Sequence, residues 1–233
     1  MTSEVFNTDC LEYMRTLPDK AFQLAIADPP YGINAAKMGM GGTKDHRRIA
    51  RKLYKEHTEK GRLNSGAGKL KDRLLNRSMI DWDNQVPTQE FFDELRRVCD
   101  NVIIWGGNYF DLPPTRCVIC WDKVQPWENF SQIELAWTSF DKPAKLYRQI
   151  NGGANCERKI HPTQKPVELY AYCLHTFAKE GDRILDTHLG SGSSRIAAHR
   201  LGFDFVGIEI DKEYFDASVE RFERECKQQP SLF

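Results

Sequence analysis

The sequence predicts an α/β protein whose sheet is mostly parallel and covered by helices on both faces. Short apolar runs alternate along the chain with longer segments in which apolar residues recur at helical spacing. The apolar runs contain few polar residues, as is typical of strands buried on both faces. The chain has 233 residues, of which 40% are hydrophobic and 28% charged, so it is large enough to bury one core. We therefore expect a single domain over residues 1–233.

The expected elements follow one another as strands and helices. The run FQLAIA at residues 22–27 is a strand that stops at two prolines, because proline supplies no donor to a sheet. A glycine at position 202 closes the helix expected at 190–202, and Asp211 is a suitable N-cap for the last helix at 211–226. The other expected strands are 101–105, 116–121, 132–140, 182–186 and 204–210, and the other expected helices are 87–99 and 161–178.

Basic residues are concentrated in one segment, although the formal net charge is zero. The segment from Lys37 to Arg77 contains 13 lysine and arginine residues and 4 acidic ones, so it carries +9 and the rest of the chain −9. Glycine clusters flank it, and we interpret residues 37–78 as an insertion into the domain. A basic segment of this kind indicates a polyanionic partner, and a solvated insertion without a ligand is the alternative. The candidates for phosphate contact are Arg47, Arg48, Arg51 and Lys52.

The composition indicates a cytoplasmic protein. No apolar run approaches the roughly 20 residues that span a bilayer, and the first residues lack the pattern of a signal peptide, so no membrane contact is expected. Seven cysteines fit a reducing compartment better than a disulfide framework. Cys117 and Cys120 form one CxxC pair, but no second pair accompanies it, so we expect no metal site.

A glycine-rich segment, DTHLGSGSS at 186–194, lies between an expected strand and an expected helix. Glycines at such a turn let the backbone approach a ligand, and an acidic residue at the end of the next strand can bind ribose hydroxyls. Glu209 has that position. Arg195 replaces the third glycine of the dinucleotide fingerprint and no GxxxxGK[ST] motif is present, which disfavours a nicotinamide enzyme or a P-loop ATPase. For the turn by itself, an ordinary tight turn is the alternative.

The segment Asp28-Pro29-Pro30-Tyr31 is more specific. Consecutive prolines restrict the backbone, so the Asp28 carboxylate, the Pro29 carbonyl and the Tyr31 ring are held rigidly. Two acceptors can take the hydrogens of an exocyclic amine while an aromatic ring stacks on the base, which is how an extruded base is read. The alternative is a strand terminator followed by a surface tyrosine.

These segments together resemble the DNA amino-methyltransferases, which methylate adenine N6 or cytosine N4 with S-adenosylmethionine. The resemblance rests on DPPYG, HPTQKP, DTHLGSGSS and GIEIDKEYF, in the order of the beta group of that family. It implies a Rossmann-like, S-adenosylmethionine-dependent methyltransferase fold with a mostly parallel seven-stranded sheet and a permuted motif order, in which the last helix precedes the segment Thr8-Asp9-Cys10 in space. The usual DPFxGSGT differs here at Thr187 and His188.

The resemblance also implies roles for individual residues. Asp28 and the Pro29 carbonyl would accept from the target amine beside Pro30, and Tyr31 would stack on the flipped base. Asn108, after the expected strand at 101–105, is a candidate for contact with DNA. Asp9 and Cys10 would contact the cofactor's adenine, Glu209 its ribose, and Lys165 with Pro166 its methionine end. The complete set of expected cofactor-binding residues is Asp9, Cys10, Lys165, Pro166, Asp186, His188, Leu189, Gly190, Gly192, Ser193 and Glu209.

The chemistry implied is direct methyl transfer, because the cofactor already carries a good leaving group and the protein has only to orient the amine and accept its charge. Asp28 before Pro-Pro-Tyr favours adenine N6, with cytosine N4 as the alternative. Carbon-5 methylation is excluded by the absence of a Pro-Cys pair, and glutamine methyltransferases typically carry Asn in place of Asp28. A catalytically inactive DNA-binding relative is a further alternative. The expected partner is double-stranded DNA, and the sequence leaves open a homodimer, a restriction partner or a recognition partner.

Overall fold

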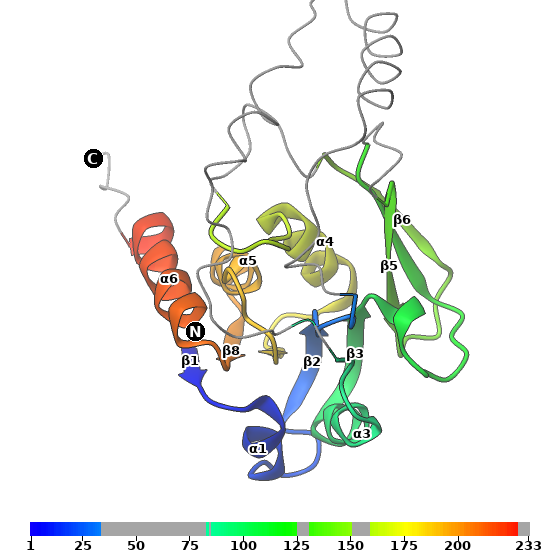
Figure 1. Ribbon diagram of the computed structural model, residues 1–233, viewed down its shortest axis with the longest axis horizontal. Helices are drawn as coiled ribbons and strands as arrows, with labels where there is room; N and C mark the ends of the chain where they lie inside the picture. The colour runs from blue at the N-terminus through cyan, green and yellow to red at the C-terminus, as the bar shows by residue number, and fades with distance from the viewer. Residues whose placement is uncertain (34–82, 84, 125–130, 151–158, 228–233) are drawn as a thin grey trace, which may run out of the picture.

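The protein is built on one eight-stranded sheet, seen in a computed structural model that describes residues 1–33, 83, 85–124, 131–150 and 159–227 (Figure 1). The strands lie in the order β1-β8-β7-β2-β3-β5-β4-β6, and five of the seven neighbouring pairs are parallel. The strands are β1 (Ser3–Asn7), β2 (Phe22–Ala27), β3 (Cys99–Trp105), β4 (Val118–Asp122), β5 (Ile133–Thr138), β6 (Lys145–Arg148), β7 (Arg183–Asp186) and β8 (Asp204–Glu209). The α-helices are α1 (Cys10–Arg15), α3 (Gln89–Val98), α4 (Val167–Phe177), α5 (Ser193–Leu201) and α6 (Lys212–Phe222), with a short 3-10 turn η3 (Gly107–Tyr109) and a π turn η4 (Glu223–Lys227).

The helices cover both faces of the sheet. Along β2, Leu24 and Ile26 belong to a core that includes α4 and α5, while Ala25 and Ala27 belong to a second core that includes α1 and α3. This alternation follows from the period of two along a strand, and it explains why β2 is apolar on both faces. Figure 1 shows α1 and α3 on one side of β2 and β3, and α4 and α5 on the other.

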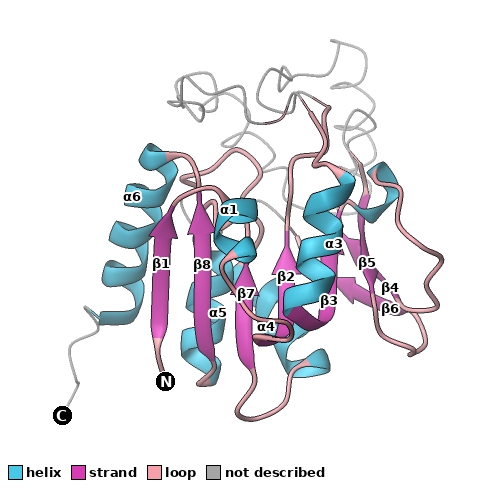
Figure 2. Cartoon of the chain, turned by 90° about the horizontal axis from the view of Figure 1, so that it is seen from below, coloured by secondary structure: helices cyan, strands magenta, loops and turns pink. Residues whose placement is uncertain are grey.

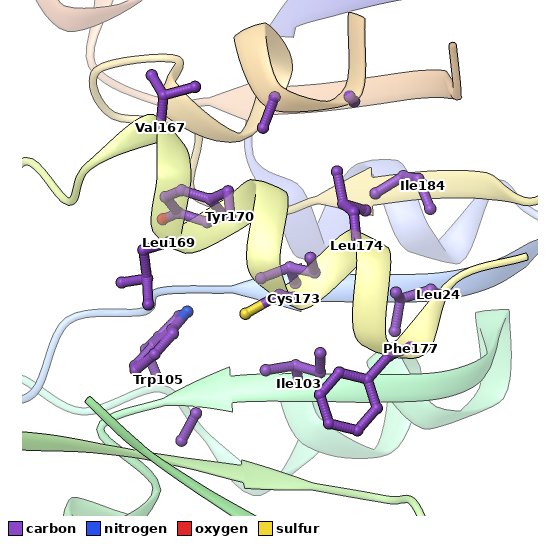
Figure 3. Packing of buried hydrophobic residues seen from close by; sticks show 14 of the residues in the cluster. Leu24, Ile103, Trp105, Val167, Leu169, Tyr170, Cys173, Leu174, Phe177 and Ile184 are labelled. Atoms are coloured by element: carbon purple, nitrogen blue, oxygen red, sulfur yellow. The ribbon is translucent and has the colours of Figure 1, made fainter. Parts of the chain in front are cut away.

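Helix α4 is anchored tightly on the middle of the sheet (Figure 3). Its side chains Cys173, Leu174 and Phe177 are buried and lie beside Leu24 and Ile103 of the strands below. Complete burial of such side chains contributes about 1.5–3 kcal/mol each, an upper estimate. The segment HPTQKP that leads into α4 is therefore held at a defined place above the sheet.

The parallel strands β1, β8, β7 and β2 all end at the same edge of the sheet, the upper edge in Figure 2. In open α/β sheets ligands bind outside the carboxyl ends of the strands, where the loops converge. The segment DPPY follows β2 and the glycine-rich turn follows β7, and these two strands are direct neighbours. The fold thus brings together two segments that are about 150 residues apart in the sequence.

The predicted fold class is confirmed, with one difference in strand number. The sheet has eight strands where the resemblance implied seven. Strands β1 and β6 have no distinct sequence signal, since most of their residues are partly or fully exposed. The permuted order is confirmed: β1 pairs with β8, and α6, at the other end of the chain, contacts β1. Asp211 caps α6 and Gly202 ends α5 as expected.

No helix within the described part of the chain is long and apolar enough to cross a membrane.

Candidate functional site

The loop after β2 is held in place by a carboxylate from beyond the expected insertion. Asp83 accepts hydrogen bonds from the backbone N–H groups of Tyr31, at 2.7 Å, and Gly32, at 2.9 Å. Gly32 has φ +71°, and a Cβ there would lie 3.2 Å from a Val86 side-chain atom, so the chain passes close to itself at this point. Residues 31–32 and Asp83, which stand on either side of the segment 34–82 in the sequence, are therefore adjacent in space.

The carboxylate of Asp28 lies in a chain of alternating charges. Lys165 Nζ is 2.5 Å from Asp28 Oδ1 and 2.7 Å from Glu134 Oε1, and Lys123 Nζ is 2.7 Å from Glu134 Oε2. The Tyr31 hydroxyl lies 2.6 Å from Asp28 Oδ1 and 2.8 Å from Glu134 Oε1, and it accepts from Lys165 at 3.2 Å. Within the described residues, every contact of the Asp28 carboxylate is made by Oδ1. Within the same residues, Oδ2 makes no hydrogen bond or ion pair.

The surroundings shift the pKa values of Asp28, Glu134 and Lys165 in different directions. Burial raises the pKa of Asp28; Lys165 opposes this effect and Glu134 adds to it. Burial alone would also raise the pKa of Glu134, but Lys165 and Lys123 lower it to about 2. Burial disfavours the charged form of Lys165, yet Asp28 and Glu134 hold its pKa above its ordinary value. Asp28 is therefore more basic than an exposed aspartate, while Glu134 stays ionised.

The ring of Tyr31 is wedged against the end of β3. Gly106, just after β3, has φ +69°, and a Cβ there would lie only 2.2 Å from Tyr31 Cε1. Tyr109 stacks on the Tyr31 ring with centroids 5.0 Å apart and an interplanar angle of 12°, and it is 44% exposed. Asn108 is exposed on the same short turn η3. Gly106 is needed here because it allows both the left-handed conformation and the close approach of the ring.

The glycine-rich turn after β7 is closed by two buried carboxylates. Asp186 accepts from the backbone N–H of His188 at 2.9 Å and from the Ser194 hydroxyl. Glu209, at the end of β8, accepts from Gly190 N at 2.7 Å through Oε2 and from Asp211 N at 2.9 Å through Oε1. A carboxylate has about four acceptor positions, so both oxygens of Glu209 retain capacity for a ligand hydroxyl.

Burial changes the ionisation of this turn as well. It raises the pKa of Asp186 to about 7 and lowers the pKa of His188 to about 4. Burial also lowers the pKa of His161 to about 3; this ring lies over Gly190, where a Cβ would be 3.8 Å from it. Both histidines are thus neutral near pH 7, and Asp186 is about half protonated there.

Helix α6 supports the turn through a buried arginine. Arg221 Nη1 donates to the Ser191 carbonyl and to the Ser193 hydroxyl, both at 2.9 Å, and Nε donates to Glu225 at 2.9 Å. The Ser193 hydroxyl in turn donates to the Lys165 carbonyl at 2.8 Å. This chain of contacts joins the glycine turn to the segment that carries Lys165, immediately before Pro166 at the N-cap of α4.

The amino-terminal segment lies beside the end of β8. Thr8 N donates to the Glu209 carbonyl at 3.2 Å, which places Asp9 and Cys10 next to the end of β8. Asp9 caps α1, accepting from Leu11 N at 2.8 Å and Glu12 N at 2.9 Å.

The structure brings most of the predicted residues to one edge of the sheet and adds three that the sequence did not indicate. Those brought together are Asp9, Cys10, Asp28, Pro29, Pro30, Tyr31, Lys165, Pro166, Asp186, His188, Leu189, Gly190, Gly192, Ser193 and Glu209. The added residues are Glu134, Asp83 and Arg221. Only Glu134 had a signal, as a lone acidic residue within an apolar strand. The candidates Arg47, Arg48, Arg51 and Lys52 lie outside the described residues.

Comparison with known proteins agrees with this arrangement. The DNA methylase family N6_N4_Mtase matches residues 120–220, which include β5, the HPTQKP segment, the glycine turn and Glu209. The Type II methyltransferase M2.DpnII of Streptococcus pneumoniae is 46% identical over 135 residues, which cover 46% of this chain and 50% of that protein. The Type II methyltransferase M.HpaI of Haemophilus parainfluenzae is 37% identical over 99 residues, covering 36% and 32%. The chain resembles the DNA amino-methyltransferases. The matches span half or less of these two relatives.

Solved structures of DNA methyltransferases share the fold. The PvuII DNA methyltransferase, described as cytosine-N4-specific, superposes with a TM-score of 0.60 at 15% identity, covering 95% of this chain and 87% of that one. The M1.HpyAVI complex with S-adenosylmethionine gives 0.55 at 17% identity, covering 94% and 98%. A complex of TTHA0409 from Thermus thermophilus with S-adenosyl-L-methionine gives 0.52 at 18% identity, covering 96% and 95%. The fold is that of S-adenosylmethionine-dependent DNA methyltransferases.

Proposed function

We propose that this protein is a DNA methyltransferase that transfers the methyl group of S-adenosylmethionine to N6 of an adenine extruded from double-stranded DNA. The observation that carries the proposal is the pairing of two features at one sheet edge. Within the described residues the Asp28 carboxylate is held through one oxygen only, and beside it lies a glycine turn whose ribose-type acceptor, Glu209, has spare capacity. The likeness to amino-methyltransferases in sequence and fold supports the same assignment.

The residues at the glycine turn fit the cofactor. S-adenosylmethionine is a cation at its sulfonium and supplies a methyl group on a good leaving group. The strand ends carry the acidic residues Asp9, Asp28 and Glu209, which suit a ligand bearing positive charge. Glu209 would hold the ribose hydroxyls, Asp9 and Cys10 would lie at the adenine, and Gly190 and Gly192 would let the backbone approach. His188, Leu189 and Ser193 would shape the turn around it.

The chain's own residues would orient and deprotonate the target amine. Asp28 Oδ2 and the Pro29 carbonyl would accept its two hydrogens, favouring a nitrogen lone pair aimed at the methyl carbon. S-adenosylmethionine, when bound, would supply the methyl group to that nitrogen, and its sulfur would keep the electron pair of the carbon–sulfur bond. The proton that the nitrogen then loses passes to Asp28, whose raised pKa makes it a competent acceptor. Tyr31, braced by Gly106 and Tyr109, would stack on the base.

The preference for adenine over cytosine is supported by the Asp28 side chain, which resembles that of the adenine enzymes. The PvuII enzyme, with a similar fold, is cytosine-specific, so the fold does not discriminate between the two bases. Cytosine N4 is therefore the second candidate, and the identity of the modified nucleoside distinguishes them.

DNA would be held by the basic segment. We expect Arg47, Arg48, Arg51 and Lys52 to neutralise phosphates, with Asn108 near the base. Replacing the four basic residues with glutamine should weaken DNA binding and flatten its salt dependence, because fewer counterions would be released; an unchanged salt slope would remove these residues from the interface. Since the relatives are Type II methyltransferases, a restriction-modification context is part of the proposal.

The proposal is tested with Asp28→Ala. Without the acceptor, methyl transfer from labelled S-adenosylmethionine to unmethylated DNA should fall at least about 100-fold, the scale of a lost acid–base group, while cofactor binding by calorimetric titration persists. Turnover close to that of the wild type would exclude Asp28 from the mechanism. Loss of cofactor binding together with activity would instead indicate a structural defect.

A further inference from the structure

We infer that Glu134 is a positioning residue for the reaction: it shares Lys165 and the Tyr31 hydroxyl with Asp28 and so keeps Asp28 available as an acceptor. The inference rests on the proposed function. Glu134 comes from β5, an antiparallel strand remote in sequence from DPPY and from the glycine turn.

The geometry shows two carboxylates competing for the same donors. One ammonium, Lys165 Nζ, lies 2.5 Å from Asp28 Oδ1 and 2.7 Å from Glu134 Oε1. One hydroxyl, that of Tyr31, lies within hydrogen-bond distance of the same two oxygens, and it has a single proton to donate. The hydrogen bonds and the positive charge that Lys165 and Tyr31 share with Glu134 therefore stabilise the Asp28 carboxylate less than they would if Asp28 were their sole partner.

Glu134 is well placed to compete. Its second oxygen lies 2.7 Å from Lys123 Nζ, and the side chains of Glu134 and Lys123 are each 15% exposed. Among the described residues, two lysines therefore pair with Glu134, whereas one lysine pairs with Asp28. Without Glu134, Lys165 would pair with Asp28 alone and would oppose the transfer of a proton or of positive charge to that carboxylate.

The groups that face Asp28 come from several elements. Besides Glu134 on β5 they are Lys165 before α4 and Tyr31 on the same loop, and Asp28 also interacts electrostatically with Tyr170 on α4 and Asp186 at the end of β7. Among those acting on Asp28, burial and Glu134 raise its pKa, whereas Lys165 lowers it. Removing Glu134 should therefore lower the pKa of Asp28, and removing Lys165 should raise it.

The test is the pH profile of the single-turnover rate of Glu134→Gln, measured with labelled S-adenosylmethionine, unmethylated genomic DNA and enzyme in excess. The acidic limb of the variant's pH–rate profile should lie about one to two pH units below that of the wild type. This is the size of shift that one charge a few ångströms away causes in a partly buried site. The plateau rate should fall about 3- to 10-fold, because a less basic acceptor takes the proton less readily. Lys165→Met should move the limb in the opposite direction.

A matched control is Asp141→Asn, which removes an exposed carboxylate paired with Arg116 on the loop after β5. It should leave both the limb and the plateau at the wild-type values. Glu134→Gln leaves Lys123 without this partner, so the double variant Glu134→Gln/Lys123→Gln removes the outer pair together. It should have a normal unfolding transition and a shift in the same direction but smaller, because a positive charge is removed with the negative one.

The outcomes separate the inference from the proposed function. A slower rate with an unmoved limb in folded variants would overturn the role of Glu134, reducing it to a structural partner of Lys165 while the wild-type activity stands. Absence of methyl transfer by the wild-type protein would contradict the proposed function itself, before any variant is compared.

Discussion

Replacing Gly106 with alanine should displace the Tyr31 ring while leaving the rest of the fold in place, and so tests whether the reaction needs the ring where it lies. Gly106 has φ +69°, and its added Cβ would lie 2.2 Å from Tyr31 Cε1. Carbon atoms in contact are about 3.5–4.0 Å apart, so the ring would have to move by more than about 1 Å. The left-handed conformation costs an alanine about 1–2 kcal/mol, and the forced packing adds about 1–3 kcal/mol. We expect the free energy of unfolding to fall by about 2–5 kcal/mol.

The effect on activity should be larger than this loss of stability suggests. A displacement of about 1 Å at a reacting group can reduce the rate about 100-fold, and the Tyr31 hydroxyl would also leave Asp28 and Glu134. Cofactor binding should persist, since the glycine turn lies on other strands. The assays are urea unfolding, calorimetric titration with S-adenosylmethionine, and the rate of methyl transfer at a temperature where the variant is folded.

Gly181→Ala is the matched control. Gly181 has φ +86° but nothing lies within 4 Å of a Cβ there, so it carries the conformational cost without the clash. It should lose about 1–2 kcal/mol of stability and keep the wild-type rate. If Gly106→Ala methylated DNA as fast as Gly181→Ala, the idea that a braced Tyr31 ring is needed for the reaction would be refuted.

Two further predictions concern the glycine turn. His188 is partly buried, and desolvation lowers its pKa to about 4 from the ordinary value of 6.5 that it has in the unfolded chain. Its contribution to stability is therefore lost as the pH falls from about 6.5 to 4. The change in the free energy of unfolding caused by His188→Phe should be more favourable by about 2 kcal/mol at pH 5 than at pH 8, and equal changes in urea unfolding at the two pH values would contradict this. Arg221→Met should destabilise the protein by about 3–5 kcal/mol and weaken cofactor binding, because Glu225 and the Ser191 carbonyl lose a buried donor; unchanged affinity in a calorimetric titration would show that α6 does not support the turn.

Much of the fold was predictable because its signals are local. The buried strand at Phe22–Ala27 and the capped helix after Asp211 follow from apolar runs, prolines and a single N-cap residue. β1 and β6 were missed because a strand at the edge of a sheet needs few apolar residues, and its pairing partner is supplied by distant sequence.

The candidate site was predictable only as far as its motifs extend. Asp28 and Gly190 lie in segments whose residue types are informative on their own. Glu134, Asp83 and Arg221 act through contacts with residues 50 or more positions away, or through a helix that returns to the turn, and no local pattern encodes such a contact. Lys165 illustrates the difference: the motif indicated a residue near the cofactor, whereas the structure shows its ammonium on Asp28.

The most direct test of the proposed activity is to incubate the wild-type protein with labelled S-adenosylmethionine and unmethylated double-stranded DNA, digest the DNA and identify the labelled nucleoside. We predict N6-methyladenine. Label in N4-methylcytosine would keep the acceptor chemistry of Asp28 and overturn the choice of base. No label in DNA, from a folded protein that binds the cofactor, would contradict the assignment of this site to DNA methylation.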